Sequence, residues 1–154
     1  MPSLKVLFLH GLESRPGGTK PSYLEKLGYE VLNPALPKYS WSESQRIAQE
    51  LIENEKPDVI VGSSRGGAIA MSLDYDLIPL VLISPAWERF NIDPVVPRSS
   101  VVLAPKEDKI VPTQLSKKLS EDNSCAFIQC GEDHRMSSSD ALEAMADAVK
   151  WVLR

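Results

Sequence analysis

The sequence predicts an α/β fold with a parallel sheet, and three observations indicate it. Six short apolar runs, rich in Val, Ile and Leu, are spaced along the chain. Several runs are continuous rather than alternating in hydrophobicity, which is typical of strands covered on both faces. Most intervals between the runs carry helix signals, and strands that alternate with helices pair in parallel. The runs are Lys5–His10, Tyr29–Asn33, Val59–Gly62, Leu80–Ser84, Val101–Ala104 and Ala126–Cys130.

Two helices are expected in the first third of the chain. Pro21 at a first helical position and Gly28 just past the last one predict a helix over residues 22–27. Ser42 and Gln45 have the spacing of a capping box, which predicts that a second helix starts there. That helix would bury Ile47, Ala48, Leu51 and Ile52.

The end of the chain predicts an amphipathic helix over Asp140–Leu153, with serines 137–139 as candidate N-caps. Its apolar stripe consists of Leu142, Met145, Ala146, Val149 and Leu153. One interval departs from the alternation of strands and helices. Pro85–Ser100 contains three prolines and no helical period, so we expect an irregular loop that is too short to form a lid domain.

Length and composition favour a single globular domain over residues 1–154. A chain of 154 residues falls in the usual single-domain range. The formal charge of −4 comes without a run of Lys and Arg, which argues against a nucleic-acid partner. The apolar stretch at the N-terminus is too short for a secretory signal or a membrane span. We therefore expect a cytoplasmic protein without a membrane partner.

The cysteines give no reason to expect a metal or a disulfide. Cys125 and Cys130 fall in one predicted strand, where ~3.3 Å per residue separates them by roughly 16 Å. They cannot form a bridge within that strand. The sequence has no CxxC motif and no His/Cys cluster, so neither a zinc site nor a cofactor is indicated.

The segment Gly62–Gly67, GSSRGG, ends a buried strand with small residues around a serine. A phosphate-binding P-loop needs Lys after its second glycine, but Ala68 follows here. The glycine spacing also fails to match a dinucleotide-binding turn. The pattern that fits is G-x-S-x-G, in which Ser64 would stand on a strained turn between a strand and a helix. The structural alternative is a glycine-rich turn without chemistry.

A serine nucleophile needs a base in contact with it, and the base needs a carboxylate that orients it. The chain has two histidines, and His134 directly follows the last predicted strand. Asp108 directly follows the preceding strand, so the chain order is Ser64, Asp108, His134. His10 is expected to have a structural role at the end of the first strand. Three other acidic residues compete with Asp108 for the carboxylate role: Glu107, Glu132 and Asp133.

An oxyanion formed at Ser64 would need two backbone N–H donors. The N–H of Arg65, at the start of the following helix, is one candidate. The other is the N–H of Leu12, in the loop after the first strand, where Gly11 permits a close approach to Ser64.

Together these segments resemble the α/β-hydrolase superfamily, in particular its short, lidless bacterial esterase-like members. The segments that carry the resemblance are His10–Gly11, Gly62–Gly67, Asp108–Pro112 and Gly131–His134, with smaller agreements at 10–16, 34–37 and 84–86. The resemblance implies a three-layer α/β/α fold with six parallel strands in the order 2-1-3-4-5-6 and no lid domain. Two features depart from the family: Arg65 stands where an uncharged residue is common, and the usual first two strands have no counterpart.

The resemblance implies a serine hydrolase that cleaves small carboxylic esters or thioesters through an acyl-enzyme, without a cofactor. Ser64 would attack the carbonyl carbon, His134 would take and return the proton, and Asp108 would orient His134. The same groups could serve another acyl-transfer enzyme, such as a peptidase, thioesterase or acyltransferase. A protein-binding module that kept the fold without activity is the other alternative.

Candidate substrate contacts are Gly11, Arg65, Trp87 and Met136. The guanidinium of Arg65 would either bind an anionic group of the substrate or form an ion pair with Glu13 or Asp133. Trp87 follows the fourth strand and would either form a wall of the acyl pocket or pack in the core. Met136 follows the candidate base closely enough to touch a substrate.

Overall fold

The computed structural model describes residues 3–154 of the chain. Its strands are β1 (Lys5–Leu9), β2 (Glu30–Leu32), β3 (Val59–Ser63), β4 (Leu80–Ile83), β5 (Val101–Ala104) and β6 (Ala126–Gln129). They form one six-stranded sheet in the order β2-β1-β3-β4-β5-β6. Every neighbouring pair is parallel. The predicted sheet, its order and all six strand positions are therefore confirmed, with ends that differ by at most one residue.

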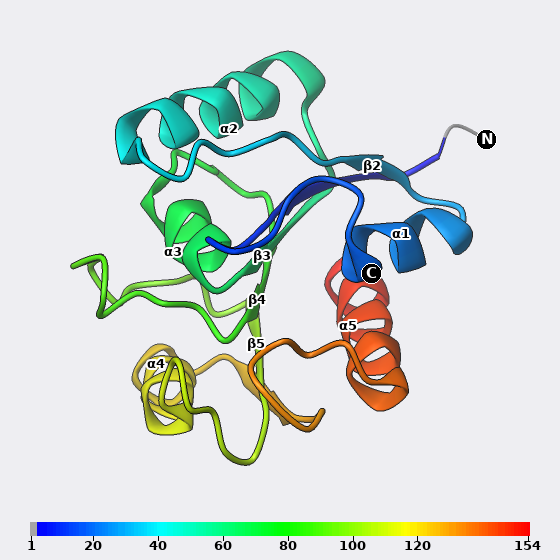
Figure 1. Cartoon of the computed structure of the whole chain (residues 1–154). Coiled ribbons are helices and arrows are strands. Elements are labelled where there is room, and N and C mark those ends of the chain that lie inside the picture. The colour runs from blue at the N-terminus through cyan, green and yellow to red at the C-terminus, as the bar shows by residue number, and fades with distance from the viewer. Residues whose placement is uncertain (1–2) are drawn as a thin grey trace.

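Five helices cover the sheet: α1 (Thr19–Lys26), α2 (Trp41–Glu55), α3 (Arg65–Ser72), α4 (Thr113–Asn123) and α5 (Ser139–Val152). α1 and α5 lie on one face, and α2, α3 and α4 lie on the other, so the molecule has three layers (Figure 1). This arrangement follows from right-handed connections between parallel strands, with the chain reversing direction across the sheet beside β1 and β3. The three-layer α/β/α fold is the one expected.

The core consists of two apolar layers, one on each face of the sheet. Alternate strand residues contribute to opposite layers, because successive side chains of a strand point to opposite faces. Val6 and Phe8 of β1 belong to the layer under α1 and α5, while Leu7 and Leu9 belong to the other layer. Each of these four side chains is at most 2% exposed. Burial on both faces explains why the sequences of β3, β4 and β5 are continuously apolar.

α1 begins earlier than its sequence signals indicated. The helix starts at Thr19, so Pro21 is its third residue and not its first. The first-turn N–H groups of a helix have no intrahelical acceptor, and proline is therefore tolerated throughout that turn. The end of the helix is as predicted: Gly28 follows the last turn with φ +100°, a conformation that favours glycine.

α2 also begins before the predicted cap. Its N-cap is Ser40, whose Oγ accepts a hydrogen bond from the Glu43 N–H at 3.2 Å. The expected cap at Ser42 is therefore wrong, because Ser42 is already within the helix. Both serines have Glu or Gln three residues later, so the local pattern did not distinguish them. The helix buries Ser44, Ala48 and Ile52, whereas the predicted Ile47 and Leu51 are only partly buried.

α5 matches its prediction closely. It spans Ser139–Val152 after the N-cap Ser138, and four of the five residues of the expected stripe are buried. The Pro85–Ser100 interval contains turns and no helix, so no lid domain is inserted between β4 and β5. No helix within residues 3–154 combines the length and apolar character needed to span a membrane.

Candidate active site

β3 leads into α3 through Ser64, whose backbone is strained. Its φ of +55° and ψ of −117° are unusual for a residue with a side chain. The turn is held on both sides, because the Ser64 N–H donates to the Ile83 carbonyl at 2.9 Å. The Ser64 carbonyl accepts from the N–H groups of Gly67, Ala68 and Ala86. These contacts present the serine at the carboxyl edge of the sheet, as the G-x-S-x-G pattern predicted.

Two glycines allow α3 to approach the sheet closely enough for this turn. A Cβ atom on Gly66 would overlap the carbonyl oxygen of Leu9 at the end of β1. A Cβ atom on Gly62 would lie 2.7 Å from the carbonyl oxygen of Gly66. Both obstacles are backbone atoms that cannot move aside without breaking the packing of α3 on the sheet. Positions 62 and 66, two residues before and two residues after Ser64, therefore require glycine.

The structure brings Ser64, His134 and Asp108 into one hydrogen-bonded chain. The Ser64 Oγ lies 2.9 Å from the His134 Nε2, and the His134 Nδ1 lies 2.7 Å from the Asp108 Oδ2. An ionised carboxylate can only accept, so the Nδ1 atom carries the proton and donates it. The Nε2 atom is then free to accept the hydroxyl proton of Ser64. This is the arrangement in which a histidine can act as a base toward the serine.

Asp108 is held in its ionised form. Its side chain is completely buried, which raises its pKa, but hydrogen bonds from His134, Val111 and Ile110 outweigh burial and leave the pKa below the usual value. The two backbone N–H groups each donate to its Oδ1 at 2.8 Å. The three competing carboxylates, on Glu107, Glu132 and Asp133, are on solvent-exposed residues.

The two predicted oxyanion donors belong to segments that meet at Ser64. A Cβ atom on Gly11 would lie only 3.4 Å from the Ser64 Cβ, so the β1–α1 loop runs directly past the serine. Within residues 3–154, the N–H groups of Leu12 and Arg65 donate no backbone or side-chain hydrogen bond of their own. Both are therefore available to a developing oxyanion.

His10 anchors the same loop and has the structural role expected of it. The residue is 5% exposed, and its Nδ1 donates to the Gly11 carbonyl at 2.8 Å. Its Nε2 accepts from the Leu36 N–H at 3.0 Å. Both ring nitrogens are thus engaged by backbone groups, and His10 takes no part in the chain of Ser64, His134 and Asp108.

The structure contradicts the expected substrate contact of Met136. Its side chain is 2% exposed and packs in the core layer under α5. The residue has a φ of +52°, and its N–H donates to the Asp133 carbonyl at 3.1 Å, which closes a turn around His134. A substrate at Ser64 cannot reach a side chain covered in this way. The pattern gave no sign of the turn, because positive φ at a methionine has no local sequence signal.

Trp87 packs in the apolar layer on the α4 side of the sheet. Its Nε1–H donates to the carbonyl of Leu115 in α4 at 3.2 Å. This is the core-packing alternative for Trp87, and the one hydrogen bond that its side chain forms within the described residues joins it to α4.

Arg65 has neither of the two surroundings expected from the sequence. Its side chain is 3% exposed, and it forms no ion pair with any carboxylate within residues 3–154. Glu13, one of the expected partners, instead pairs with Lys38 at 3.1 Å. The expected surface ion pair is therefore wrong, and a guanidinium covered in this way does not face a substrate. The guanidinium instead contacts Pro37, Trp41 and Ser44, and no sequence pattern linked Arg65 to these residues.

No metal site is formed by the described residues. Cys125 and Cys130 are both free thiols. Within residues 3–154, no group of three or more His, Cys, Asp or Glu side chains is placed to hold a metal ion.

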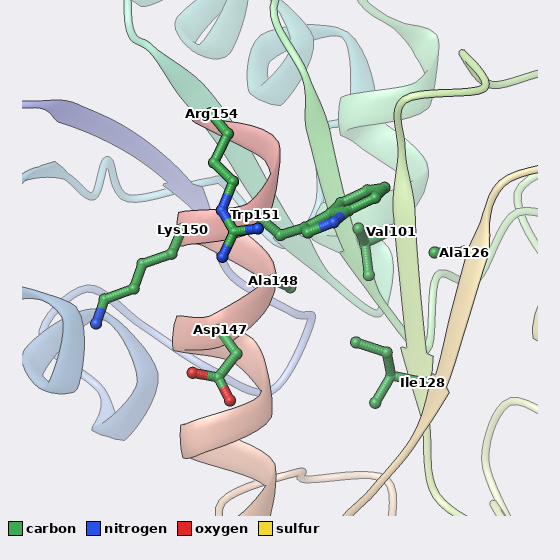
Figure 2. Close-up of a pocket in the computed structure, with 8 residues that line it drawn as sticks. All are labelled: Val101, Ala126, Ile128, Asp147, Ala148, Lys150, Trp151 and Arg154. Atoms are coloured by element: carbon green, nitrogen blue, oxygen red, sulfur yellow. The ribbon is translucent and has the colours of Figure 1, made fainter.

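A cavity of about 420 Å³ lies between α5 and the strands β5 and β6, away from Ser64. Trp151 reaches from α5 toward Val101 and Ala126, and Lys150 points away from the sheet (Figure 2). Val101 and Ala126 are the first residues of their strands, so the cavity lies toward the amino ends. Ser64 follows the carboxyl end of β3, and the cavity is therefore not part of the site around it.

Comparison with known proteins finds similarity in structure rather than in sequence. No protein-family model matches the chain, and no curated protein matches it either. Among solved structures, a candidate hydrolase from Agrobacterium vitis is similar with a TM-score of 0.77 and 19% identity, over 99% of this chain and 88% of that one. A candidate hydrolase of the alpha/beta superfamily from Xanthomonas campestris gives a TM-score of 0.77 and 19% identity, over 99% of this chain and 98% of that one.

The monoacylglycerol lipase of Paleococcus ferrophilus is also similar, with a TM-score of 0.74 and 17% identity, over 97% of this chain and 93% of that one. These likenesses extend over nearly the whole length of each protein. They agree with the sheet order and with the placement of helices on both faces. The chain is therefore a small, lidless representative of the α/β-hydrolase fold.

Proposed function

We propose that this protein is a serine hydrolase that cleaves small carboxylic esters or thioesters through an acyl-enzyme. The observation that carries the proposal is the hydrogen-bonded chain from Ser64 through His134 to the buried carboxylate of Asp108. A serine with this base and this orienting carboxylate is equipped for nucleophilic attack on a carbonyl carbon.

In the first half of the reaction, the Ser64 Oγ attacks the carbonyl carbon while its proton passes to the His134 Nε2. The carboxylate of Asp108 stabilises the positive charge that forms on the imidazole. The carbonyl oxygen becomes an oxyanion and accepts hydrogen bonds from the N–H groups of Leu12 and Arg65. When the tetrahedral intermediate collapses, the leaving alcohol or thiol takes the proton from His134, and the acyl group stays on Ser64.

In the second half, a water molecule attacks the acyl carbon and gives a proton to His134. Collapse of this second intermediate releases the acid and returns the proton to Ser64. Side chains and backbone N–H groups of the chain supply every group that these steps require, so the proposed reaction uses no cofactor. We place it in the single domain of residues 1–154 and in the cytoplasm.

One observation favours a small acyl group, and another favours an ester as the substrate class. The β4–β5 connection contains turns and no helix, which leaves little protein to enclose a long acyl chain. One protein of similar fold is a monoacylglycerol lipase, which favours an ester without indicating the length of its acyl chain.

The proposal is tested by labelling the protein with a fluorophosphonate and by assaying short-chain p-nitrophenyl esters. Wild type should be labelled and active, and Ser64→Ala should lose the label and about 10³-fold or more of kcat. Ser63→Ala is the matched control, because Ser63 is the adjacent serine at the end of β3 and should keep both properties. Labelling of Ser64→Ala would contradict the proposed nucleophile. A wild-type protein that is neither labelled nor active would favour a binding module instead.

A further inference from the structure

Arg65 is a buried cation without a counter-ion, directly beside the candidate nucleophile. Its side chain is 3% exposed, and its Nη1 atom is buried without a hydrogen-bond partner in the described part of the chain. Burial also lowers its pKa. Burying an unpaired charge is unfavourable, so buried cations are normally paired with carboxylates. Features that cost stability in this way concentrate at functional sites.

The guanidinium docks on the segment where the β2–α2 loop turns into α2. Its Nη2 donates to the Pro37 carbonyl at 3.1 Å and to the Ser44 Oγ at 3.3 Å. Its carbon Cζ lies 5.6 Å from the centre of the Trp41 ring, within the range of a cation–π contact. The Pro37 carbonyl also accepts from the Ser40 N–H and the Ser44 Oγ. Arg65 therefore joins the first turn of α3 to the start of α2.

Leu36, the residue before Pro37, supports the loop that carries the other proposed oxyanion donor. The N–H of Leu36 donates to the His10 Nε2, and the His10 Nδ1 donates to the Gly11 carbonyl. Gly11 immediately precedes Leu12, whose N–H is one proposed oxyanion donor. Leu36–Pro37 thus touches both the loop that carries this donor and the side chain of Arg65, whose N–H is the other donor.

We infer that Arg65 is a positioning residue, an inference that rests on the proposed function. Through Pro37 and Leu36, its guanidinium fixes the spacing between the N–H groups of Leu12 and Arg65. Preorganised donors lose much of their effect when they move by a fraction of an ångström from the oxyanion. The guanidinium itself does not touch the substrate, because Trp41 and the loop backbone cover it.

The experiment compares Arg65→Met, which keeps the length of the side chain without its charge and donors, with Arg65→Lys, which keeps the charge. Arg46→Met is the control, because Arg46 is an exposed arginine of α2 that pairs with Glu43 and Glu50 on the surface. For each variant, the active sites are counted by fluorophosphonate titration. We then measure kcat and KM for a neutral ester and for a hemisuccinate ester, and the affinity for a trifluoromethyl ketone. The Ser64 Oγ adds to the carbonyl carbon of this ketone. The adduct places an oxyanion between the N–H groups of Leu12 and Arg65.

Arg65→Met should lower kcat per active site by roughly 10- to 100-fold, with KM within about two-fold of wild type. The affinity for the trifluoromethyl ketone should fall by the same factor as kcat/KM. The value of kcat/KM should fall equally for the neutral ester and for the hemisuccinate ester. Arg65→Lys should recover part of the loss, and Arg46→Met should match wild type. A purely structural role would reduce the number of active sites or the unfolding midpoint but leave the ketone affinity per site unchanged.

Unchanged kcat and ketone affinity in Arg65→Met would overturn the inference, and so would a loss confined to the hemisuccinate ester. If Arg65→Met does not fold, Arg65→Lys and Ser44→Ala provide the test. Ser44→Ala removes one acceptor of the guanidinium and should give a smaller loss of kcat and of ketone affinity. Wild-type values of kcat and ketone affinity in both Arg65→Lys and Ser44→Ala would overturn the inference. An inert wild-type protein would overturn the proposed function as well, whereas an active wild type with an unaffected Arg65→Met would overturn only the role of Arg65.

Discussion

Lys20 is the second residue of α1 and lies near the loop that carries His134. The residue is partly buried and forms no ion pair within the described residues. Burial lowers its pKa to about 8, with a further lowering from Arg135 and an opposing effect from Asp133. In an unfolded chain, lysine titrates near ~10.4. Between these two values the unfolded protein binds more protons, so the free energy of unfolding rises with pH across that range.

Replacing Lys20 by Met should therefore stabilise the protein near neutral pH, because the buried charge is removed. We expect the free energy of unfolding to rise by ~1–2 kcal/mol at about pH 7 and the gain to shrink toward zero above about pH 10. Urea titrations at both pH values measure the difference. Lys26→Met, at the exposed end of the same helix, serves as the control and should show no such pH dependence. An equal gain at both pH values would mean that the charge of Lys20 is not the cause.

At the scale of elements, the start of α2 matters because both Ser40 and Ser44 contact the segment that Arg65 binds. Ser40→Ala removes the acceptor of the Glu43 N–H and should cost ~1 kcal/mol of unfolding free energy. Ser42→Ala is the matched control, because Ser42 is an exposed residue inside the helix and should change the stability by less than ~0.5 kcal/mol. Urea titration of both variants gives the comparison. The reverse order of effects would place the cap at Ser42.

At the scale of the whole molecule, the absence of an inserted lid predicts how activity depends on the physical state of the substrate. The β4–β5 connection contains only turns within the described residues, so no helix has to move before a substrate enters. For an ester assayed across its solubility limit, the rate should follow the dissolved concentration and level off once that limit is reached. A jump in rate when an emulsion forms would show that some part of the molecule opens at an interface.

The sequence predicted the parts of the molecule that depend on local periodicity and local backbone geometry. The short apolar runs located all six strands. In β3, β4 and β5 the run is continuous because the strand is buried on both faces, whereas the edge strands β2 and β6 are only partly buried. The glycines around Ser64 predicted the turn, since side chains at Gly62 and Gly66 would collide with backbone. The resemblance to α/β-hydrolases supplied the order of the strands. Ser64, Asp108 and His134 each follow the end of a predicted strand. These positions predicted that the three side chains could meet at the site.

The tertiary structure alone decided which groups surround the site, because these contacts join residues far apart in the chain. The Nη2 of Arg65 binds groups that are 21 and 28 residues away, and no pattern around Arg65 distinguishes these partners from a surface carboxylate. Met136 is buried by a single turn of the backbone, and Ser40 caps α2 because of where the preceding loop delivers the chain. Local sequence determines which element a residue forms. The packing of loops against helices determines what its side chain touches, and that packing is settled only when the whole chain has folded.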